Sequence, residues 1–334
     1  MIDTTTYLGI EADLGLQMFR ARAIEGSRPH ETVSDGLIIH LPWGDVQAVK
    51  VKSGLRLTLR ANNRERLFLL QEVVDKRLDQ AGIELDRRWS LNDLGGSPPN
   101  LAFTEVDVVT RLSPSYYRVR LRGTDLSRFF RDGLHFRILF GPDSHRGEWP
   151  AIGSTGRIEW PGGIASWHRP VYTARVIDSL RGTMEFDIFS HEGGRVTEWC
   201  RALRQGDDVA IMGPSGEWYP HAKWLALFGD ETALPAIARI LEERPAGSVG
   251  SATILVSDKG DIQDLKKPGQ VEVNWLVRGG SRSLIDAVLE LDIPQTDRFV
   301  WFAGERSECN SVRRVLLERG VDKSEMRTAS YWSR

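Results

Sequence analysis

The sequence predicts a multidomain α+β and α/β protein: a small α+β domain, an antiparallel β-barrel, and an α/β domain with a parallel sheet. Three observations carry this prediction. The helix-breaking run Gly95–Asn100 separates an N-terminal block from the rest. Many short strand-like runs with glycine and proline between them follow, which is typical of a small barrel. Near residue 222 the pattern changes to alternating strands and helices, which indicates a parallel sheet.

The chain of 334 residues has room for roughly two to three domains of about 150 residues. We place a small α+β domain at 1–94, a linker at 95–101, the barrel at 102–220 and the α/β domain at 221–334. In the first domain, Leu37–Leu41 and Leu55–Leu59 resemble short strands. Asn63 to Gly82 predicts an amphipathic helix with apolar residues at helical spacing: Leu67, Leu70, Val74, Leu78 and Ala81. This domain contains no recognisable set of catalytic or ligand-binding residues, and its role stays open.

The second domain begins with a predicted hairpin, in which Val106–Leu112 and Tyr116–Gly123 flank the turn Ser113-Pro114-Ser115. Further strand-like runs are Phe136–Phe140, Val171–Ile177, Met184–Phe189 and Asp208–Met212.

In the third domain, strand-like and helix-like runs alternate along the chain. The predicted strands are Trp224–Phe228, Ala252–Val256, Val271–Val277 and Phe299–Ala303. The predicted helices are Leu234–Leu241, Ser283–Leu291 and Ser311–Arg319. Alternation at this length favours a parallel sheet of the nucleotide-binding type.

The overall composition excludes several classes of protein. The formal net charge of -2 gives no global basic surplus for nucleic acid. The only cysteines, Cys200 and Cys309, exclude a disulfide framework and a four-cysteine iron–sulfur cluster. No His/Cys cluster suggests a metal site. No apolar run reaches the ~20 residues that span a bilayer, and the N-terminus has no signal-peptide pattern. We therefore expect a cytoplasmic protein without membrane or nucleic-acid partners.

The strongest local signal is the segment Arg169–Arg175. Arginines at its two ends offer cations for phosphate, Tyr172 offers an aromatic face for a planar ring, and Thr173 offers a hydroxyl. A dinucleotide with a tricyclic flavin needs these groups. An ordinary exposed strand would also explain them.

About twenty residues later, Gly193 and Gly194 precede an apparent helix start. Glycines there let backbone N–H groups approach a pyrophosphate at the positive end of a helix. His191, Val196 and Thr197 belong to the same predicted site, and Thr197 could add a hydroxyl donor. The alternative is a plain turn in which His191 is structural.

Two strand-to-helix turns of the third domain fit a nicotinamide nucleotide at the carboxyl edge of a parallel sheet. The first turn contains Gly229, Asp230, Glu231, Thr232, Ala233 and Pro235, and the second contains Ala303, Gly304 and Glu305. The fingerprint G-x-G-x-x-G is absent. Alternatively, Thr232 caps one helix and Glu305 the next. Near the C-terminus, Tyr331 and Trp332 could cover a flavin or pack as a tail.

Taken in order, these motifs resemble those of the siderophore-interacting proteins. The motifs are Arg169-x-x-Tyr172-Thr173-x-Arg175, Gly194-Arg-Val-Thr197-Glu-Trp199, Gly229-Asp-Glu-Thr-Ala-Leu-Pro-Ala-Ile, Trp301-x-Ala-Gly-Glu305 and Tyr331-Trp332. That family comprises FAD-dependent ferric-siderophore reductases similar in architecture to ferredoxin–NADP reductases. The resemblance covers about Ala102 to Arg334, and it implies an FAD-binding barrel followed by an NAD(P)H-binding domain. The N-terminal block resembles a small domain of unknown role that is sometimes fused ahead of such reductases.

The resemblance also implies roles for single positions. Arg169 would contact the FAD phosphates, Tyr172 would pack on the isoalloxazine, and Thr173 would hydrogen-bond near its reactive nitrogen. The turn Gly194–Thr197 would hold the pyrophosphate. The segments Gly229–Pro235 and Ala303–Glu305 would face the nicotinamide nucleotide. The chain departs from the family at Arg195, where proline is common, and at the serines that flank its terminal aromatic pair.

We therefore expect hydride transfer from NADPH or NADH to FAD and then reduction of Fe(III) held by a siderophore. No catalytic group beyond the flavin is expected except Thr173. Two alternatives stay open: a flavin-dependent reductase for another acceptor, and a non-enzymatic siderophore-binding module. The siderophore, the oligomeric state and the choice between NADPH and NADH are open too; Lys259 and Arg278 are candidate cations for a 2′-phosphate.

Overall fold

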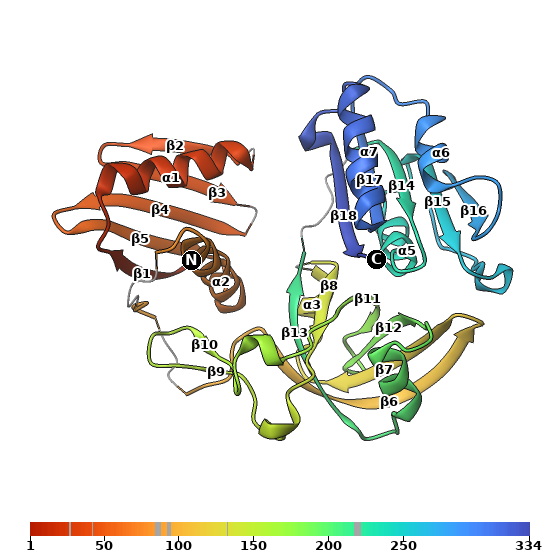
Figure 1. Cartoon of the computed structure of the whole chain (residues 1–334), viewed down its shortest axis with the longest axis horizontal. Helices are drawn as coiled ribbons and strands as arrows, with labels where there is room; N and C mark the ends of the chain where they lie inside the picture. Colours follow the sequence, from red (N-terminus) through yellow and green to blue (C-terminus); the bar gives the residue numbers. More distant parts are fainter. Residues whose placement is uncertain (27, 42, 84–87, 92–94, 132, 217–221) are drawn as a thin grey trace. The chain divides into compact units, whose positions relative to one another are not determined.

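The computed structural model describes the chain from residue 1 to residue 334 except residues 27, 42, 84–87, 92–94, 132 and 217–221. The described residues form two compact units (Figure 1). Met1–Leu101 and Leu139–Arg169 make up the first, and Ala102–Ile138 and Pro170–Arg334 the second. Residues 139–169 thus group with the N-terminal residues although they lie within the segment 102–220. The predicted boundaries at 94, 101 and 220 stay a prediction.

The first unit contains a five-stranded antiparallel sheet in the order β1-β5-β4-β3-β2. Its strands are β1 (Ile2–Leu8), β2 (His30–Val33), β3 (Gly36–Leu41), β4 (Gly44–Val51) and β5 (Gly54–Ala61). Alternate side chains of a strand point to opposite faces. In β5, Leu55, Leu57 and Leu59 are buried, whereas Arg56 is exposed. One face of the sheet therefore carries the core.

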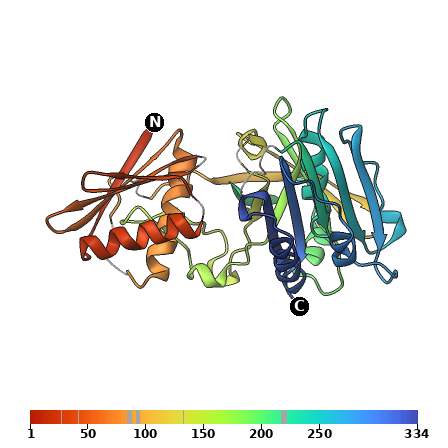
Figure 2. The ribbon, with the colours of Figure 1, turned by 90° about the horizontal axis from the view of Figure 1, so that it is seen from above.

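Two helices, α1 (Ala12–Glu25) and α2 (Arg64–Gln80), contribute to this core. Figure 2 shows α1 lying along the sheet. The helix predicted over Asn63–Gly82 is confirmed. Asn63 caps α2, because its side-chain oxygen accepts a hydrogen bond from the Arg66 N–H at 2.9 Å. Gly82, with φ of 72°, follows its end.

Residues 139–169 are held to the N-terminal residues by several hydrogen bonds. The buried Gln71 side chain donates to the Gly156 carbonyl at 2.7 Å, and the Ile152 backbone bonds with Gly95 and Gly96. The segment contains the short elements η1 (Asp143–His145), β9 (Ala151–Ile152), β10 (Ile158–Glu159) and η2 (Ile164–Ser166).

The second unit begins with a closed six-stranded barrel in the order β11-β12-β7-β6-β13-β8. Its strands are β6 (Leu101–Ser113), β7 (Tyr116–Gly123), β8 (His135–Ile138), β11 (Val171–Asp178), β12 (Thr183–Phe189) and β13 (Asp208–Ser215). The short helices α3 (Arg128–Arg131) and α4 (Arg195–Ala202) accompany them. The predicted antiparallel barrel and its first hairpin, β6–β7, are confirmed.

The rest of the second unit is a five-stranded parallel sheet in the order β16-β15-β14-β17-β18, as predicted. Its strands are β14 (Trp224–Gly229), β15 (Val249–Val256), β16 (Gln270–Val277), β17 (Arg298–Glu305) and β18 (Met326–Trp332). The helices are α5 (Leu234–Glu243), α6 (Leu284–Leu289) and α7 (Arg306–Glu318), with short turns η3 (Lys259–Asp261) and η4 (Lys323–Glu325). The strand order reverses between β14 and β17, and sheets of this kind bind ligands at such a switch point.

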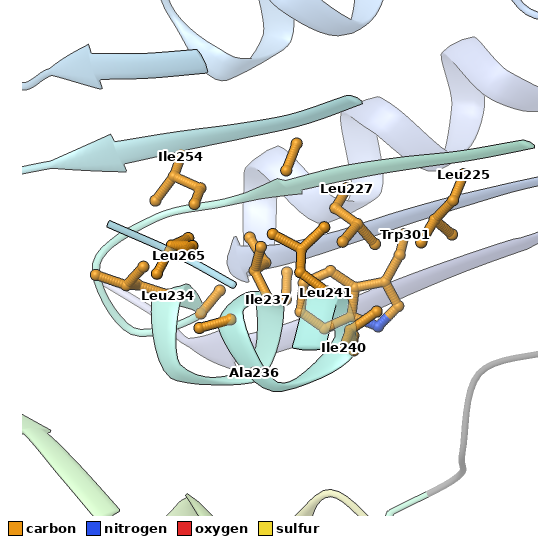
Figure 3. Packing of buried hydrophobic residues seen from close by; sticks show 14 of the residues in the cluster. Leu225, Leu227, Leu234, Ala236, Ile237, Ile240, Leu241, Ile254, Leu265 and Trp301 are labelled. Atoms are coloured by element: carbon orange, nitrogen blue, oxygen red, sulfur yellow. The ribbon is translucent and has the colours of Figure 1, made fainter. Parts of the chain in front are cut away.

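Both faces of this sheet are buried. Leu225 and Leu227 of β14 join a cluster with α5, and Figure 3 shows Ile237 and Leu241 of that helix beside Trp301 of β17. The alternate residues Ala226 and Phe228 join a second cluster with α6 and α7. A strand buried on both faces reads as a continuous apolar run, which explains why β14 was predictable from the sequence.

Candidate functional site

Strand β11 places Tyr172 and Thr173 in the barrel wall. They pair with Phe136 and His135 of β8, respectively. The Tyr172 ring lies 5.5 Å from that of Phe186, and burial raises the Tyr172 pKa, so its hydroxyl is protonated at neutral pH. Thr173 is only 5% exposed, and its hydroxyl oxygen lies 3.2 Å from His135 Nδ1.

The arginines at the two ends of the Arg169–Arg175 segment have different surroundings. In the first unit, the Arg169 guanidinium lies over the ring of Trp160, 4.8 Å from its centroid, which holds the cation by a cation–π contact. In the second unit, Arg175 is mostly buried, and its guanidinium nitrogens lie 3.7 Å from carboxylate oxygens of Asp187 and Glu242. Arg175 therefore links the barrel to helix α5 through two carboxylates.

The glycine turn before α4 has the geometry of an anion-binding site. Gly193 has φ of 71°, a conformation that favours glycine, and Gly194 is the N-cap residue of α4 without a side-chain cap bond. A Cβ on Gly194 would lie 2.6 Å from the His191 ring, so this exposed ring would have to shift to admit another side chain. The first-turn N–H groups and the helix dipole thus favour a phosphate there.

Within this turn, Thr197 has an internal role. Its hydroxyl oxygen accepts a hydrogen bond from the His191 backbone N–H at 3.2 Å, and the residue is buried. Val196, in the first turn of α4, is half-buried, and His191 is exposed. The Thr197 hydroxyl therefore stabilises the turn.

Two glycines lie at the carboxyl edge of the parallel sheet. Gly229 is the last residue of β14, and Gly304 is the next-to-last residue of the adjacent strand β17. Gly229 of β14 pairs with Ala303 of β17, and Gly304 follows. A Cβ on Gly229 would lie 2.5 Å from that of Ala233, and one on Gly304 would lie 2.8 Å from Oδ2 of Asp230. The close packing at this edge depends on both glycines.

Asp230 lies at the centre of this edge and is 1% exposed. Its Oδ1 accepts hydrogen bonds from the N–H and hydroxyl of Thr232, at 2.9 and 2.6 Å. Its Oδ2 accepts the indole N–H of Trp332 at 2.6 Å. Burial raises the Asp230 pKa, although these donors oppose the shift. The predicted residues Thr232 and Trp332 thus both bond to the predicted residue Asp230.

Thr232 bonds to Asp230 and does not cap a helix. Helix α5 has Ala233 as its N-cap residue and Pro235 in its first turn. The alternative interpretation of Thr232 as a helix cap is therefore wrong.

Glu231 is 2% exposed, and its carboxylate is fully paired. Arg278 binds it with two nitrogens at 2.8 and 2.6 Å, and the Ser257 hydroxyl donates at 2.6 Å. Burial alone would raise the Glu231 pKa, but the hydrogen bonds from Arg278 and Ser257 outweigh it, so the pKa is lowered. The candidate phosphate-binding cation Arg278 is therefore in an ion pair with Glu231.

Glu305 caps helix α7. Its Oε2 accepts hydrogen bonds from the Ser307 hydroxyl and from the backbone N–H groups of Ser307 and Glu308. The bond to Ser307 lowers the Glu305 pKa. This arrangement matches the capping alternative, and the N-terminal end of α7 lies at the same sheet edge as Gly304.

Sequence reasoning missed two residues of this region, His135 and Arg239. His135 bonds to Thr173 and also to Tyr331, whose hydroxyl lies 3.0 Å from Nε2. Arg239 of α5 is 2% exposed and donates to the carbonyls of Leu134 and Ala174. Neither residue belongs to a local motif, because the partners named here lie at least 38 residues away in the sequence.

The described residues fit FAD and a nicotinamide nucleotide. Tyr172 offers a half-buried ring, and Thr173 offers a buried hydroxyl. The N-terminus of α4, which follows Gly194 and has no side-chain cap, offers backbone N–H groups for a phosphate. The edge formed by Gly229 and Gly304 offers the switch point of a parallel sheet.

A closed barrel followed by such a sheet defines the architecture of ferredoxin–NADP reductases. A solved structure of that enzyme from Neisseria gonorrhoeae, with FAD and NADP bound, matches the fold with a TM-score of 0.51 over 70% of this chain and 99% of its own, at 10% identity.

Residues 105–218 match the siderophore-interacting FAD-binding domain, and residues 222–334 match the siderophore-interacting protein model. The chain belongs to the siderophore-interacting protein family, as its motifs predict, and the prediction of an FAD-binding domain is confirmed.

Several known proteins are similar over about two thirds of the chain. The NADPH-dependent ferric-chelate reductase of Escherichia coli is 30% identical, over 70% of this chain and 94% of its own. The ferric vibriobactin reductase ViuB of Vibrio cholerae is 29% identical, over 67% of this chain and 86% of its own. A siderophore utilization protein from T. fusca has a TM-score of 0.61 at 30% identity, over 70% of this chain and 93% of its own. Within the described residues, no helix combines the length and apolarity needed to cross a bilayer.

Proposed function

We propose that the chain uses NAD(P)H and FAD to reduce Fe(III) held by a siderophore, so that iron leaves as Fe(II). The observation that carries the proposal is the buried Thr173 hydroxyl beside the half-buried Tyr172 ring, in the barrel that matches an FAD-binding domain. Similarity to enzymes named NADPH-dependent ferric-chelate reductase and ferric vibriobactin reductase supports the substrate class.

Bound FAD would supply the electron chemistry by accepting a hydride from the nicotinamide and giving electrons singly to iron. One hydride carries an electron pair, which reduces a pair of Fe(III) ions and leaves a proton to be released. A chelator with oxygen ligands holds Fe(II) less tightly than Fe(III), because Fe(II) has the lower charge. Reduction would therefore favour release of the metal.

The protein's part is to bind and orient. Tyr172 would pack on the flavin ring, and Thr173 would place its hydroxyl at the reactive nitrogen. The N–H groups that open α4 would hold the pyrophosphate, with Arg169 as a further phosphate contact. The edge at Gly229, Ala303 and Gly304 would receive the nicotinamide nucleotide.

The test uses the full chain reconstituted with FAD. We expect a flavin absorption spectrum, bleaching by NADPH under anaerobic conditions, and Fe(II) capture by a ferrous-specific chelator when ferric siderophore is added. Failure to bind FAD would overturn the proposal. Turnover on quinones or dyes but not on ferric siderophores would instead assign a reductase for another acceptor.

A matched pair of variants locates the flavin. Tyr172→Leu should weaken FAD binding, because it removes the ring proposed to stack on the isoalloxazine. Tyr117→Leu is the control, since Tyr117 lies in the barrel strand β7 and its hydroxyl accepts a hydrogen bond from Arg111 at 2.7 Å. Equal loss of FAD affinity in both variants would remove Tyr172 from the site.

A further inference from the structure

His135 uses both of its ring nitrogens and connects Thr173 to the C-terminal strand. Nδ1 lies 3.2 Å from the Thr173 hydroxyl oxygen, and Nε2 lies 3.0 Å from the Tyr331 hydroxyl oxygen. The rings of His135 and Tyr331 meet edge to face, with centroids 5.5 Å apart. The three side chains come from β8, β11 and β18.

The backbone fixes this histidine in place. His135 begins β8 and pairs with Thr173 of β11 on one side and Ser215 of β13 on the other. Gly216 makes room for the ring, because a Cβ there would lie 2.8 Å from His135 Cδ2. On the far side, the Tyr331 ring contacts Trp301 edge to face at 6.2 Å. The side chains are therefore held by three strands of the barrel and two of the parallel sheet.

His135 is neutral at physiological pH. Burial lowers its pKa to about 4, and Arg239, Arg327 and Arg137 add to the shift. These cations belong to α5, β18 and β8, the elements around the ring. A neutral imidazole donates from one nitrogen and accepts at the other. The nitrogen that carries the ring proton therefore determines which groups donate and which accept along the hydrogen bonds between Thr173, His135 and Tyr331.

Two directions are possible. In one, Tyr331 donates to Nε2 and Nδ1–H donates to Thr173, which leaves the threonine proton free to point away from His135. In the other, Thr173 donates to Nδ1 and Nε2–H donates to Tyr331, which leaves the threonine oxygen free to accept. The exchange moves the ring proton from Nδ1 to Nε2 with no net gain or loss of protons.

We infer that His135 and Tyr331 are positioning residues that set whether the Thr173 hydroxyl donates or accepts toward its ligand. The inference rests on the proposed function, in which that ligand is the reactive flavin nitrogen. That nitrogen lacks a proton in oxidised flavin and needs a donor, and it bears a proton in reduced flavin and needs an acceptor. The His135 tautomer therefore follows the redox state of the flavin.

The first test needs no flavin. Nitrogen-15 NMR of the full chain with labelled histidine, assigned with His135→Gln, reports the tautomer and charge of each ring. We expect His135 to stay neutral from roughly pH 8 to pH 5 and to change its tautomer balance in Tyr331→Phe. The control Tyr117→Phe should leave its signals unchanged. Titration of His135 near pH 6.5, or identical signals in Tyr331→Phe, would overturn the inference.

The second test is a double-mutant cycle on the FAD-loaded chain, read by the flavin midpoint potential and visible spectrum. Tyr331→Phe should shift both, and the shift should vanish when Thr173 is already Val, because the effect passes through the threonine hydroxyl. An unchanged shift in the Thr173→Val background, or no shift at all, would refute the role. If the wild-type chain binds no FAD, both the proposed function and this inference fail. If FAD binds and NADPH reduces it, but the effects of Tyr331→Phe and Thr173→Val simply add, the inference alone is rejected.

Discussion

Trp332 donates its indole N–H to Oδ2 of Asp230 at 2.6 Å, across 102 residues of sequence. Asp230 follows the end of β14, and Trp332 is the last residue of β18. The strand β17 lies between them in the sheet. This hydrogen bond therefore fastens the C-terminal strand to the edge at which the proposed nicotinamide site lies.

Replacing Trp332 with Phe should lower stability in a pH-dependent way. A hydrogen bond to a charged group contributes about 1.5–3 kcal/mol. The folded Asp230 pKa is raised by burial, so protonation of this group favours the folded state as the pH falls. Losing the Trp332 donor raises the pKa further. The loss in unfolding free energy should therefore be largest at pH 7 and shrink as the pH falls through the raised folded pKa of Asp230, because the protonated carboxyl no longer offers a charged acceptor.

Urea denaturation of wild type and Trp332→Phe at several pH values measures this difference. Trp224→Phe is the control, since Trp224 begins β14 at the opposite end of the strand. A loss that is independent of pH would show that Trp332 acts by packing alone.

Arg278→Gln should leave the buried Glu231 carboxylate without its main partner. Because the Arg278 side chain is 43% exposed, water screens the pair, and we expect a loss of about 1–2 kcal/mol in unfolding free energy. The folded Glu231 pKa is lowered, so its contribution is present above about pH 4.3, the unfolded value, and is lost as the pH falls through the folded pKa. Without Arg278 the folded Glu231 pKa should rise, so the difference between wild type and variant should be largest above that raised pKa and shrink as the pH falls toward the lowered wild-type value.

Lys259→Gln is the matched control for Arg278→Gln, because Lys259 is an exposed cation that follows the neighbouring strand β15. Denaturation should show no change in this variant. Steady-state kinetics of both variants with NADPH and NADH then separates stability from cofactor choice. An unchanged KM for NADPH in Lys259→Gln would remove that residue from the 2′-phosphate site.

The sequence predicted the elements whose signal is local. Strand β14 is a continuous apolar run, α2 has both an N-cap and a helical apolar period, and the turn before α4 contains paired glycines. It did not predict α1, in which the buried positions are only Gly15, Phe19 and Ala23. Gly15 has no side chain and Ala23 has only a methyl group, so the apolar face is hard to recognise. Strand β18 was also missed, because the apolar residues of its sequence MRTASYW neither alternate nor form a continuous run.

The candidate site was predictable in its parts and not in its connections. Motifs identified Thr173 and Trp332, but their partners His135 and Asp230 lie 38 and 102 residues away. Such pairs depend on strand order and register, which leave no periodic trace in one sequence. Arg175 illustrates the same limit, since its contact with Asp187 depends on the pairing of β11 with β12, and its contact with Glu242 depends on how α5 packs on the barrel.

Gly229→Ala should destabilise the parallel sheet by overpacking. The new Cβ would lie 2.5 Å from the Ala233 Cβ and 2.9 Å from Ile237 Cδ1, so helix α5 would have to move. Overpacking of this kind costs about 1–3 kcal/mol. Gly247→Ala is the control, because a Cβ on Gly247 would meet no other atom within 4 Å. Thermal unfolding should show a lower Tm for the first variant only, and equal values would contradict the packing argument.

Arg239→Met should be the most damaging of these substitutions. Arg239 is buried, and it donates to the Ala174 carbonyl at 3.1 Å and to Glu243 at 3.0 Å. Removing one partner of a buried ion pair costs about 3–5 kcal/mol. Burial raises the Glu243 pKa and Arg239 opposes the shift, so the variant leaves Glu243 with a still higher pKa. The loss in unfolding free energy should therefore be greatest at neutral pH and smaller in acid. Arg239→Lys keeps the charge but replaces the separated donor nitrogens of the guanidinium with a single nitrogen, and it should fall between wild type and Arg239→Met in urea denaturation. If both variants unfold at the wild-type urea concentration, Arg239 does not stabilise the contact between α5 and β11.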